Sequence, residues 1–224
     1  MDIRSLVVTI SIVAIPIIIA IVLHEVAHGW VAWRLGDPTA KMLGRLTLNP
    51  LAHVDLFGTI ILPLILLFSH SGILFGYAKP VPINFLNLRR PKQDMVWVAA
   101  AGPAMNLVLA LFAGVVFRGL MGMGSAAPVG SFFLEPVLRM LITAVQINVL
   151  LAIFNLIPIP PADGGRILVG LLPEGPARLV SKIEPVGMVL LMVFLLFDPM
   201  NLFSHTVLSV VRNLTLFFLG SWRL

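Results

Sequence analysis

The most constraining feature of the sequence is a group of polar residues inside its first long apolar segment. His24, Glu25 and His28 lie among apolar neighbours. Ionisable side chains in a membrane-length segment are costly and are functional by default. On a helix, residues four apart share one face, about 6 Å apart along the axis. The pattern H-E-x-x-H therefore predicts that both imidazoles bind one metal ion and that Glu25 reaches a water beside it. The alternative is a set of buried polar groups that satisfy one another.

The composition indicates a multispanning membrane protein. Hydrophobic residues make up 59% of the 224 residues, charged residues only 11%, and the mean hydropathy is +1.04. A soluble domain of this size carries about 25% charged residues. The net charge of +5 does not indicate nucleic-acid binding, because the basic residues lie in short loops between apolar runs. The absence of cysteine excludes disulfides and thiol catalysis.

The apolar runs predict one membrane-embedded domain over residues 1–224, an all-α polytopic bundle of about five to six hydrophobic segments. Full spans are expected at about 6–33, 94–118 and 133–157, and shorter ones at about 183–197 and 202–219. Residues 56–68 are apolar but short for a crossing, and fit a re-entrant helix. Alternating or proline-broken stretches at 40–48 and 72–84 predict a small membrane-associated β element.

A catalytic zinc site usually has three protein ligands, so the two histidines need a partner. The candidates are Asp55, Asp163, His53, His70 and His205. We favour Asp163, because Gly164 and Gly165 let the backbone bend toward the bundle and the preceding prolines fix its approach. An Asp-Gly turn without any ligand would explain the same residues.

A shared metal requires the ends of the first and third spans to face the same side of the membrane. Residues 56–68 must then turn back, or cross with a compensating partner. The basic residues favour the same arrangement. Ten of them collect on the metal's side, namely Arg34, Lys41, Arg45, Lys79, Arg89, Arg90, Lys92, Arg166, Arg178 and Lys182, against Arg4, Arg118 and Arg139 on the other. The positive-inside rule then predicts a multi-pass protein of the cell membrane (plasma or inner membrane), with the site toward the cytoplasm and the N-terminus outside.

Several motifs occur in order along residues 15–170. They are His24-Glu25-Val26-Ala27-His28, Asn49-Pro50-Leu51-Ala52-His53, Gly76-Tyr77-Ala78-Lys79-Pro80-Val81-Pro82, Gly102-Pro103-Ala104-Met105-Asn106, and Asn155-Leu156-Ile157-Pro158 before Asp163-Gly164-Gly165. Together they resemble the site-2 protease family, the intramembrane zinc metalloproteases of the M50 type. The second and third motifs are similar to the short bacterial and archaeal branch that lacks a PDZ domain.

The resemblance implies one zinc ion with His24, His28 and Asp163 as ligands, and Glu25 as the general acid and base. Family members typically have Leu-Asp-Gly where this chain has Ala162 before the aspartate, an exchange that bears on local packing.

The resemblance also implies secondary roles. Asn155 is assigned to substrate or oxyanion contact, with Asn106 as a further candidate for which an interhelical hydrogen bond is the alternative. His53 is a candidate accessory residue, with a local hydrogen bond as the alternative. The predicted β element would hold an extended peptide along an exposed strand edge.

The expected function is that of a zinc-dependent endopeptidase that cleaves transmembrane segments of membrane proteins. Its catalytic core would occupy about residues 6–170, followed by C-terminal helical segments at about 180–220. The expected partners are a transmembrane protein or peptide substrate and the lipid bilayer, without nucleic acid; a gating partner or a homo-oligomer is left open. Two alternatives are a metal or ion transporter, which would not require Glu25, and a catalytically silent scaffold, which would not need the ligand set.

Overall fold

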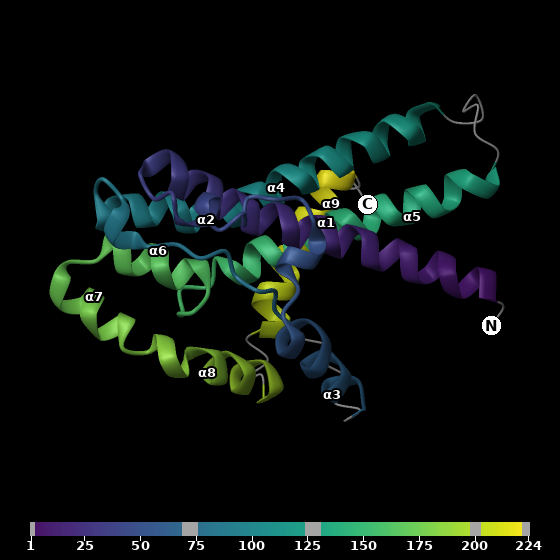
Figure 1. The fold of residues 1–224 in the computed structure, drawn as a ribbon. Coiled ribbons are helices and arrows are strands. Elements are labelled where there is room, and N and C mark those ends of the chain that lie inside the picture. Colours follow the sequence, from purple (N-terminus) through teal and green to yellow (C-terminus); the bar gives the residue numbers. More distant parts are fainter. Residues whose placement is uncertain (1–2, 69–75, 124–130, 198–202, 221–224) are drawn as a thin grey trace. The chain divides into compact units, whose positions relative to one another are not determined.

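The computed structural model describes residues 3–68, 76–123, 131–197 and 203–220, and every regular element in these ranges is helical (Figure 1). The three long helices are α1 (Ile3–Leu35), α4 (Pro91–Met123) and α5 (Ser131–Asn155). The shorter helices are α2 (Thr39–Met42), η1 (Pro50–His53), η2 (Leu56–Ile61), α3 (Leu62–Phe68), η3 (Phe85–Asn87), α6 (Asp163–Leu171), α7 (Glu174–Ser181), α8 (Glu184–Phe197), η6 (Phe203–Val207) and α9 (Leu208–Leu219).

Within the described ranges, three helices are long and apolar enough to cross a membrane. They cover Val7–Leu35, Pro91–Gly122 and Leu134–Asn155, close to the three full spans that the sequence predicts. Many of their apolar side chains are exposed, including Ile10 and Ile18 of α1. Exposed apolar side chains on a hydrogen-bonded helix suit a lipid environment. The all-α prediction is confirmed for the described residues, and the total of five to six segments stays a prediction.

The predicted β element is wrong for the described residues, which contain no strand. Residues 40–42 belong to α2, and a turn follows in which the Arg45 N–H donates to the Ala40 carbonyl at 2.9 Å. Residues 76–84 are extended but pair with no other strand. The remaining residues of that stretch, 72–75, lie outside the described residues. Within the described residues, a strand edge that holds substrate is therefore not supported.

The reason is that the extended segment bonds to irregular backbone and to side chains. The N–H groups of Tyr77, Lys79 and Val81 donate to the Gly58 carbonyl, the His53 carbonyl and the Glu25 carboxylate at 3.0, 2.9 and 2.8 Å. Pro80 and Pro82 have no N–H to offer a ladder. The Arg45 side chain donates to the Lys79 carbonyl at 2.9 Å. The residue pattern of this stretch carried no information about these partners.

The short run at 56–68 forms η2 and α3, and neither helix reaches the length of a membrane span. Asp55 caps the start of η2, where its Oδ1 accepts a hydrogen bond from the Gly58 N–H at 2.7 Å. This helical length agrees with the re-entrant interpretation, which stays a prediction.

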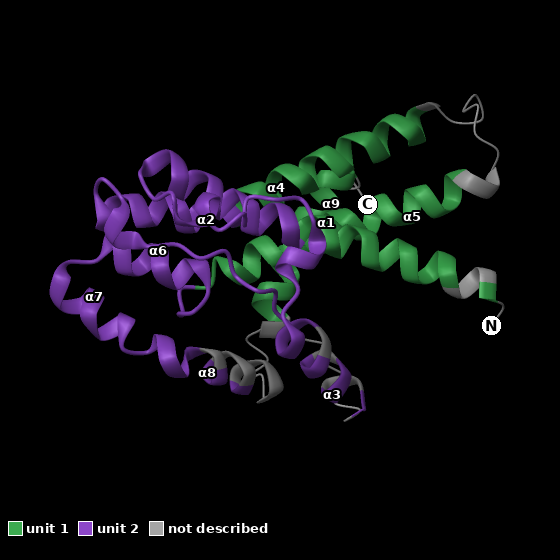
Figure 2. Cartoon of the chain, viewed as in Figure 1, with its two compact units in different colours: residues 1–20, 103–157, 199–224 green, residues 21–102, 158–198 purple. Residues whose placement is uncertain are grey.

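The chain divides into two compact units (Figure 2). Unit 1 comprises residues 1–20, 103–157 and 199–224. Its core is built from small and β-branched residues of α4 and α5, with side chains of α9 against them. The buried residues are Ala110, Ala113, Val145 and Val149, and the partners from α9 include Val211, Leu214 and Phe218.

Unit 2 comprises residues 21–102 and 158–198. Asp37 organises the polypeptide after α1 and is fully buried. Its carboxylate accepts hydrogen bonds from the Thr39 N–H and hydroxyl, from the Asn84 N–H at 2.8 Å and from the Asn87 amide at 3.0 Å. This one side chain therefore ties the segment before α4 to the end of α1. Ala32, Leu88 and Val98 form an apolar cluster in the same unit.

Candidate metal and catalytic site

Helix α1 presents His24 and His28 on one face. Their Nε2 atoms lie 3.0 Å apart, and the rings meet edge to face with centroids 4.6 Å apart. Both residues are buried. The i, i+4 spacing alone explains this convergence, because it stacks the two side chains one turn apart on the same side of the helix.

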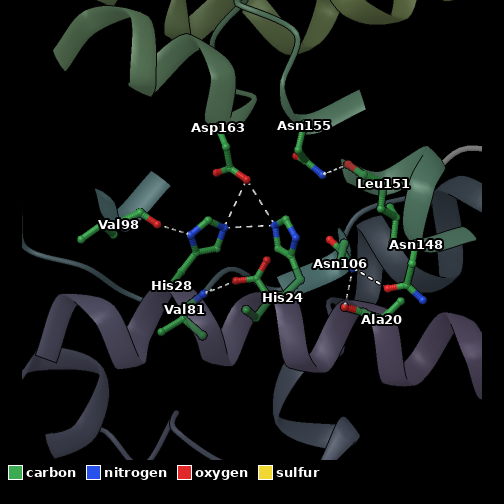
Figure 3. A network of polar contacts seen from close by, with 11 residues as sticks. Ala20, His24, His28, Val81, Val98, Asn106, Asn148, Leu151, Asn155 and Asp163 are labelled. Carbon is green, nitrogen blue, oxygen red and sulfur yellow. Dashed lines mark hydrogen bonds and ion pairs between the residues drawn. The ribbon is translucent and has the colours of Figure 1, made fainter. Parts of the chain in front are cut away.

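Helix α6 supplies the third group. Asp163 is its first residue, and its Oδ2 lies 3.2 Å from the Nε2 of His24 and 3.2 Å from the Nε2 of His28 (Figure 3). Gly165 makes this turn sterically feasible, since a Cβ there would collide with the backbone of Ile159 and Pro160. The donor group that the sequence predicted is thus assembled within unit 2 from residues 135 positions apart, counting from His28 to Asp163.

The donor set fits a metal cation. The Nδ1 of His28 lies 2.7 Å from the Val98 carbonyl, which can only accept, so Nδ1 carries the hydrogen. In the neutral ring, the Nε2 of His28 then carries a lone pair, which faces the Asp163 Oδ2. That oxygen is buried and has no hydrogen-bond partner. A lone pair on the His28 Nε2 and the charged Asp163 oxygen repel each other at this distance unless a proton or a metal cation lies between them.

The distances also agree with zinc. Ligand atoms about 2.0–2.1 Å from a tetrahedral Zn²⁺ lie about 3.3 Å from one another. The three donor atoms here are separated by 3.0, 3.2 and 3.2 Å. Burial alone would raise the pKa of the Asp163 carboxyl, but its interactions with His24 and His28 hold that pKa well below its usual range. The carboxylate is therefore ionised and ready to bind a cation.

Glu25 lies beside the histidines but belongs to a different set of contacts. It is half-buried, and its Oε2 accepts a hydrogen bond from the Val81 N–H at 2.8 Å. This bond fixes one carboxylate oxygen and leaves the other, Oε1, for a further partner.

Gly102 of α4 lies directly against the two imidazoles. A Cβ at this position would collide with the Nε2 of His28 and with the Cε1 and Nε2 of His24. The absence of a side chain is therefore what lets α4 approach the two imidazoles.

Asn106 and Asn155 both belong to unit 1. Asn106 is fully buried and donates to the Asn148 side chain at 2.8 Å and to the Ala20 carbonyl at 3.3 Å. These are hydrogen bonds between helices, because Ala20 belongs to α1, Asn106 to α4 and Asn148 to α5. Asn155 donates to the Leu151 carbonyl at 3.0 Å, one turn earlier in α5. Their roles toward substrate stay predictions.

The remaining candidate ligands have other surroundings. His53 is buried, and its Nε2 lies 3.0 Å from the Thr47 carbonyl, outside the three-residue donor group. Asp55 caps η2, and His205 lies in η6. His70 lies outside the described residues. The accessory role suggested for His53 stays a prediction.

Two supporting groups were not found by sequence reasoning, namely the Val98 carbonyl and the Val81 N–H. Both are backbone atoms, so residue type carries no signal for them. The prolines on either side of Val81 are the single hint, because they isolate its N–H as a donor in the segment.

Comparisons with known proteins agree with this site. The family model "Peptidase family M50" matches residues 12–133 and 117–197. A Bacillus subtilis (strain 168) protein named "Putative zinc metalloprotease YwhC" is 38% identical over 182 residues, which cover 80% of this chain and 77% of that protein. A Mycolicibacterium smegmatis protein named "Putative zinc metalloprotease Rip2" is 29% identical, over 82% of this chain and 66% of its own length. No solved structure matches the chain. The sequence motifs, the assembled donor group and the family match lead to one conclusion: the chain belongs to peptidase family M50, the site-2 protease family.

Proposed function

We propose that this protein is a zinc-dependent intramembrane endopeptidase that cleaves transmembrane segments of membrane proteins. The observation that carries the proposal is the convergence of two imidazoles and a carboxylate beside Glu25 on a helix long and apolar enough to cross a membrane. The names of both relatives support zinc as the cofactor. A peptide bond within the membrane is the substrate that such a location favours.

His24, His28 and Asp163 hold the metal in this proposal. Zinc, when bound, lowers the pKa of a water molecule and polarises the scissile carbonyl. The bond from His28 to the Val98 carbonyl keeps that ring in the tautomer whose Nε2 lone pair faces the metal position. Burial of all three ligands excludes bulk water and strengthens their electrostatic attraction for a cation.

Glu25 moves the proton. Its Oε2 is held by the Val81 N–H, so Oε1 takes the proton from the attacking water and then delivers it to the leaving amine nitrogen. The carboxylate thus returns to its starting charge after one turnover. A backbone N–H suits this role because it orients the carboxylate and does not itself ionise near neutral pH.

The proposal places the protein in the cell membrane with its site toward the cytoplasm. The distribution of basic residues supports this orientation, and the short helices at 56–68 support a re-entrant element. The catalytic core would be carried by residues 6–170, with a single-span membrane protein as partner.

The test is cleavage of candidate single-span substrates by the purified protein, compared with Glu25→Gln and with chelator-treated protein. We expect Glu25→Gln to lower cleavage by about 10²–10⁴-fold, the usual contribution of general acid–base catalysis, while one zinc per chain is retained. Unchanged cleavage by Glu25→Gln would overturn the mechanism.

A metal transporter is the competing function. It predicts zinc flux into proteoliposomes that survives Glu25→Gln, together with no cleavage by the unchanged protein. A silent scaffold predicts neither flux nor cleavage.

A further inference from the structure

Unit 2 contains a hollow of about 590 Å³ that none of the metal ligands lines. It is formed by the start of α4, by α6 and by α7. Three cationic side chains line it, namely Lys92, Arg178 and Lys182. An apolar wall is formed by Phe85, Met95 and Val169. Cations next to apolar side chains are suited to bind an amphipathic anion.

The hollow keeps an excess of positive charge. Glu174 is the only carboxylate among the described residues that line it, and it pairs with Arg178 at 3.3 Å. Both partners of this pair are largely exposed, so water screens it strongly. In the described part of the chain, no carboxylate lies within ion-pair distance of Lys92 or Lys182.

The hollow also lies where polar chain meets apolar helix. Lys92 is the second residue of α4, at the start of the candidate membrane span Pro91–Gly122. Lys182 directly follows α7 and stands two residues before α8, whose Val186, Val189 and Leu190 are exposed. Both cations therefore stand at the boundary between a polar surface and segments suited to hydrocarbon, which is the depth of phospholipid headgroups.

We propose that this hollow binds an anionic phospholipid. Its phosphate would contact Lys92, Arg178 and Lys182, and the upper part of an acyl chain would cover the apolar wall. A free phosphate would use the cations but leave that wall uncovered. An acidic peptide would also match the charge, but neither the apolar wall nor the position at the start of a membrane span calls for one. The site is independent of proteolysis.

The experiment titrates purified protein in neutral detergent with dioleoylphosphatidylglycerol or dioleoylphosphatidylcholine and counts retained lipids by native mass spectrometry. We expect the anionic lipid to be retained in preference to the zwitterionic one. The triple variant Lys92→Gln/Arg178→Gln/Lys182→Gln should bind it about a hundredfold more weakly, at about fivefold for each cation lost. The matched control removes three cations outside the hollow, Arg118→Gln/Arg139→Gln/Arg212→Gln, and should bind like the unchanged protein.

A single variant guards against misfolding. Lys182 is exposed, so Lys182→Gln should leave the thermal midpoint of lipid-free protein unchanged and still weaken binding about fivefold. Equal retention of the two lipids, or equal loss in the control triple, would overturn the proposal. Competition by inorganic phosphate at the same concentration would reassign the hollow to free phosphate. Displacement of the lipid by an acidic peptide that binds more tightly would reassign it to a protein partner.

Discussion

Gly102→Ala is the change that most directly tests the packing around the metal ligands. The added methyl carbon would lie 2.6 Å from the Cε1 and Nε2 of His24 and would collide with the Nε2 of His28. Ordinary contacts between such atoms are about 3.5–4.0 Å, so the imidazoles or the helices must move apart by about 1 Å. His28 has little freedom to turn away, because its Nδ1 bonds to the Val98 carbonyl. Val98 lies one turn before Gly102 in α4.

Inserting one methyl group into a packed site costs about 1–3 kcal/mol. If the strain is relieved by displacing the ligands, zinc affinity falls by about 5–150-fold. The assay is competition for zinc against a chromophoric chelator, with metal content measured by mass spectrometry. Gly119→Ala is the control, since it makes the same exchange in α4 with open space around the new methyl. Zinc affinity of Gly102→Ala equal to that of Gly119→Ala would refute the packing argument.

Four further changes separate the site's components. Asp163→Asn should lower zinc affinity by more than about 100-fold, beyond the usual effect of an outer-shell partner, as equilibrium dialysis would measure. Val81→Pro should reduce cleavage by about 10–100-fold through a misplaced Glu25 and retain zinc, whereas Val81→Ala should retain both. Asp37→Asn should lower the free energy of unfolding by about 2–3 kcal/mol at pH 7, measured by detergent titration, because a charged acceptor of several hydrogen bonds is lost. Burial raises the pKa of Asp37, but the hydrogen bonds to its carboxylate outweigh burial and lower the pKa overall. The ionised carboxylate therefore stabilises the folded protein at pH values above the pKa that Asp37 has in the unfolded chain. This stabilisation is lost as the pH falls through the lower pKa of the folded protein. The gap between Asp37→Asn and the unchanged protein should therefore close below about pH 4. Asn106→Ala should lower the thermal midpoint, because the buried Asn148 Oδ1 loses the donor that Asn106 supplies, and should leave cleavage per folded molecule unchanged. A selective loss of turnover would instead support the substrate role.

The convergence of the candidate metal ligands was predictable in part because the arrangement of two of them follows from local geometry. His24 and His28 are fixed relative to each other by one helical turn, whatever the rest of the chain does. Asp163 required a longer argument, from the side of the membrane on which the first and third spans end and from its flanking glycines. The structure brings it to the predicted partners. The three long helices were predictable for a similar reason, since hydropathy over a membrane-length window is a strong local signal.

The β element failed because pairing is not local. The proline-broken stretch at 72–84 predicted a strand, yet a strand also needs a partner with free donors and acceptors. The described part of that stretch uses its N–H groups on Glu25 and on irregular backbone, and Pro80 and Pro82 remove two others. None of these partners is visible in the spacing of hydrophobic residues.

The same contacts give Glu25, the proposed base, and the candidate metal ligands separate supports. His28 is oriented by α4 through the Val98 carbonyl, and Asp163 is positioned by α6. Glu25 is oriented by Val81, in an extended segment that contributes no metal ligand. A change in that segment can therefore misplace the proton acceptor without loosening the metal, and a change at α4 can do the reverse. Substitutions in α4 should consequently change zinc content, and substitutions around Val81 should change cleavage without changing zinc content. A scaffold that only binds metal would not need the separate support of Glu25.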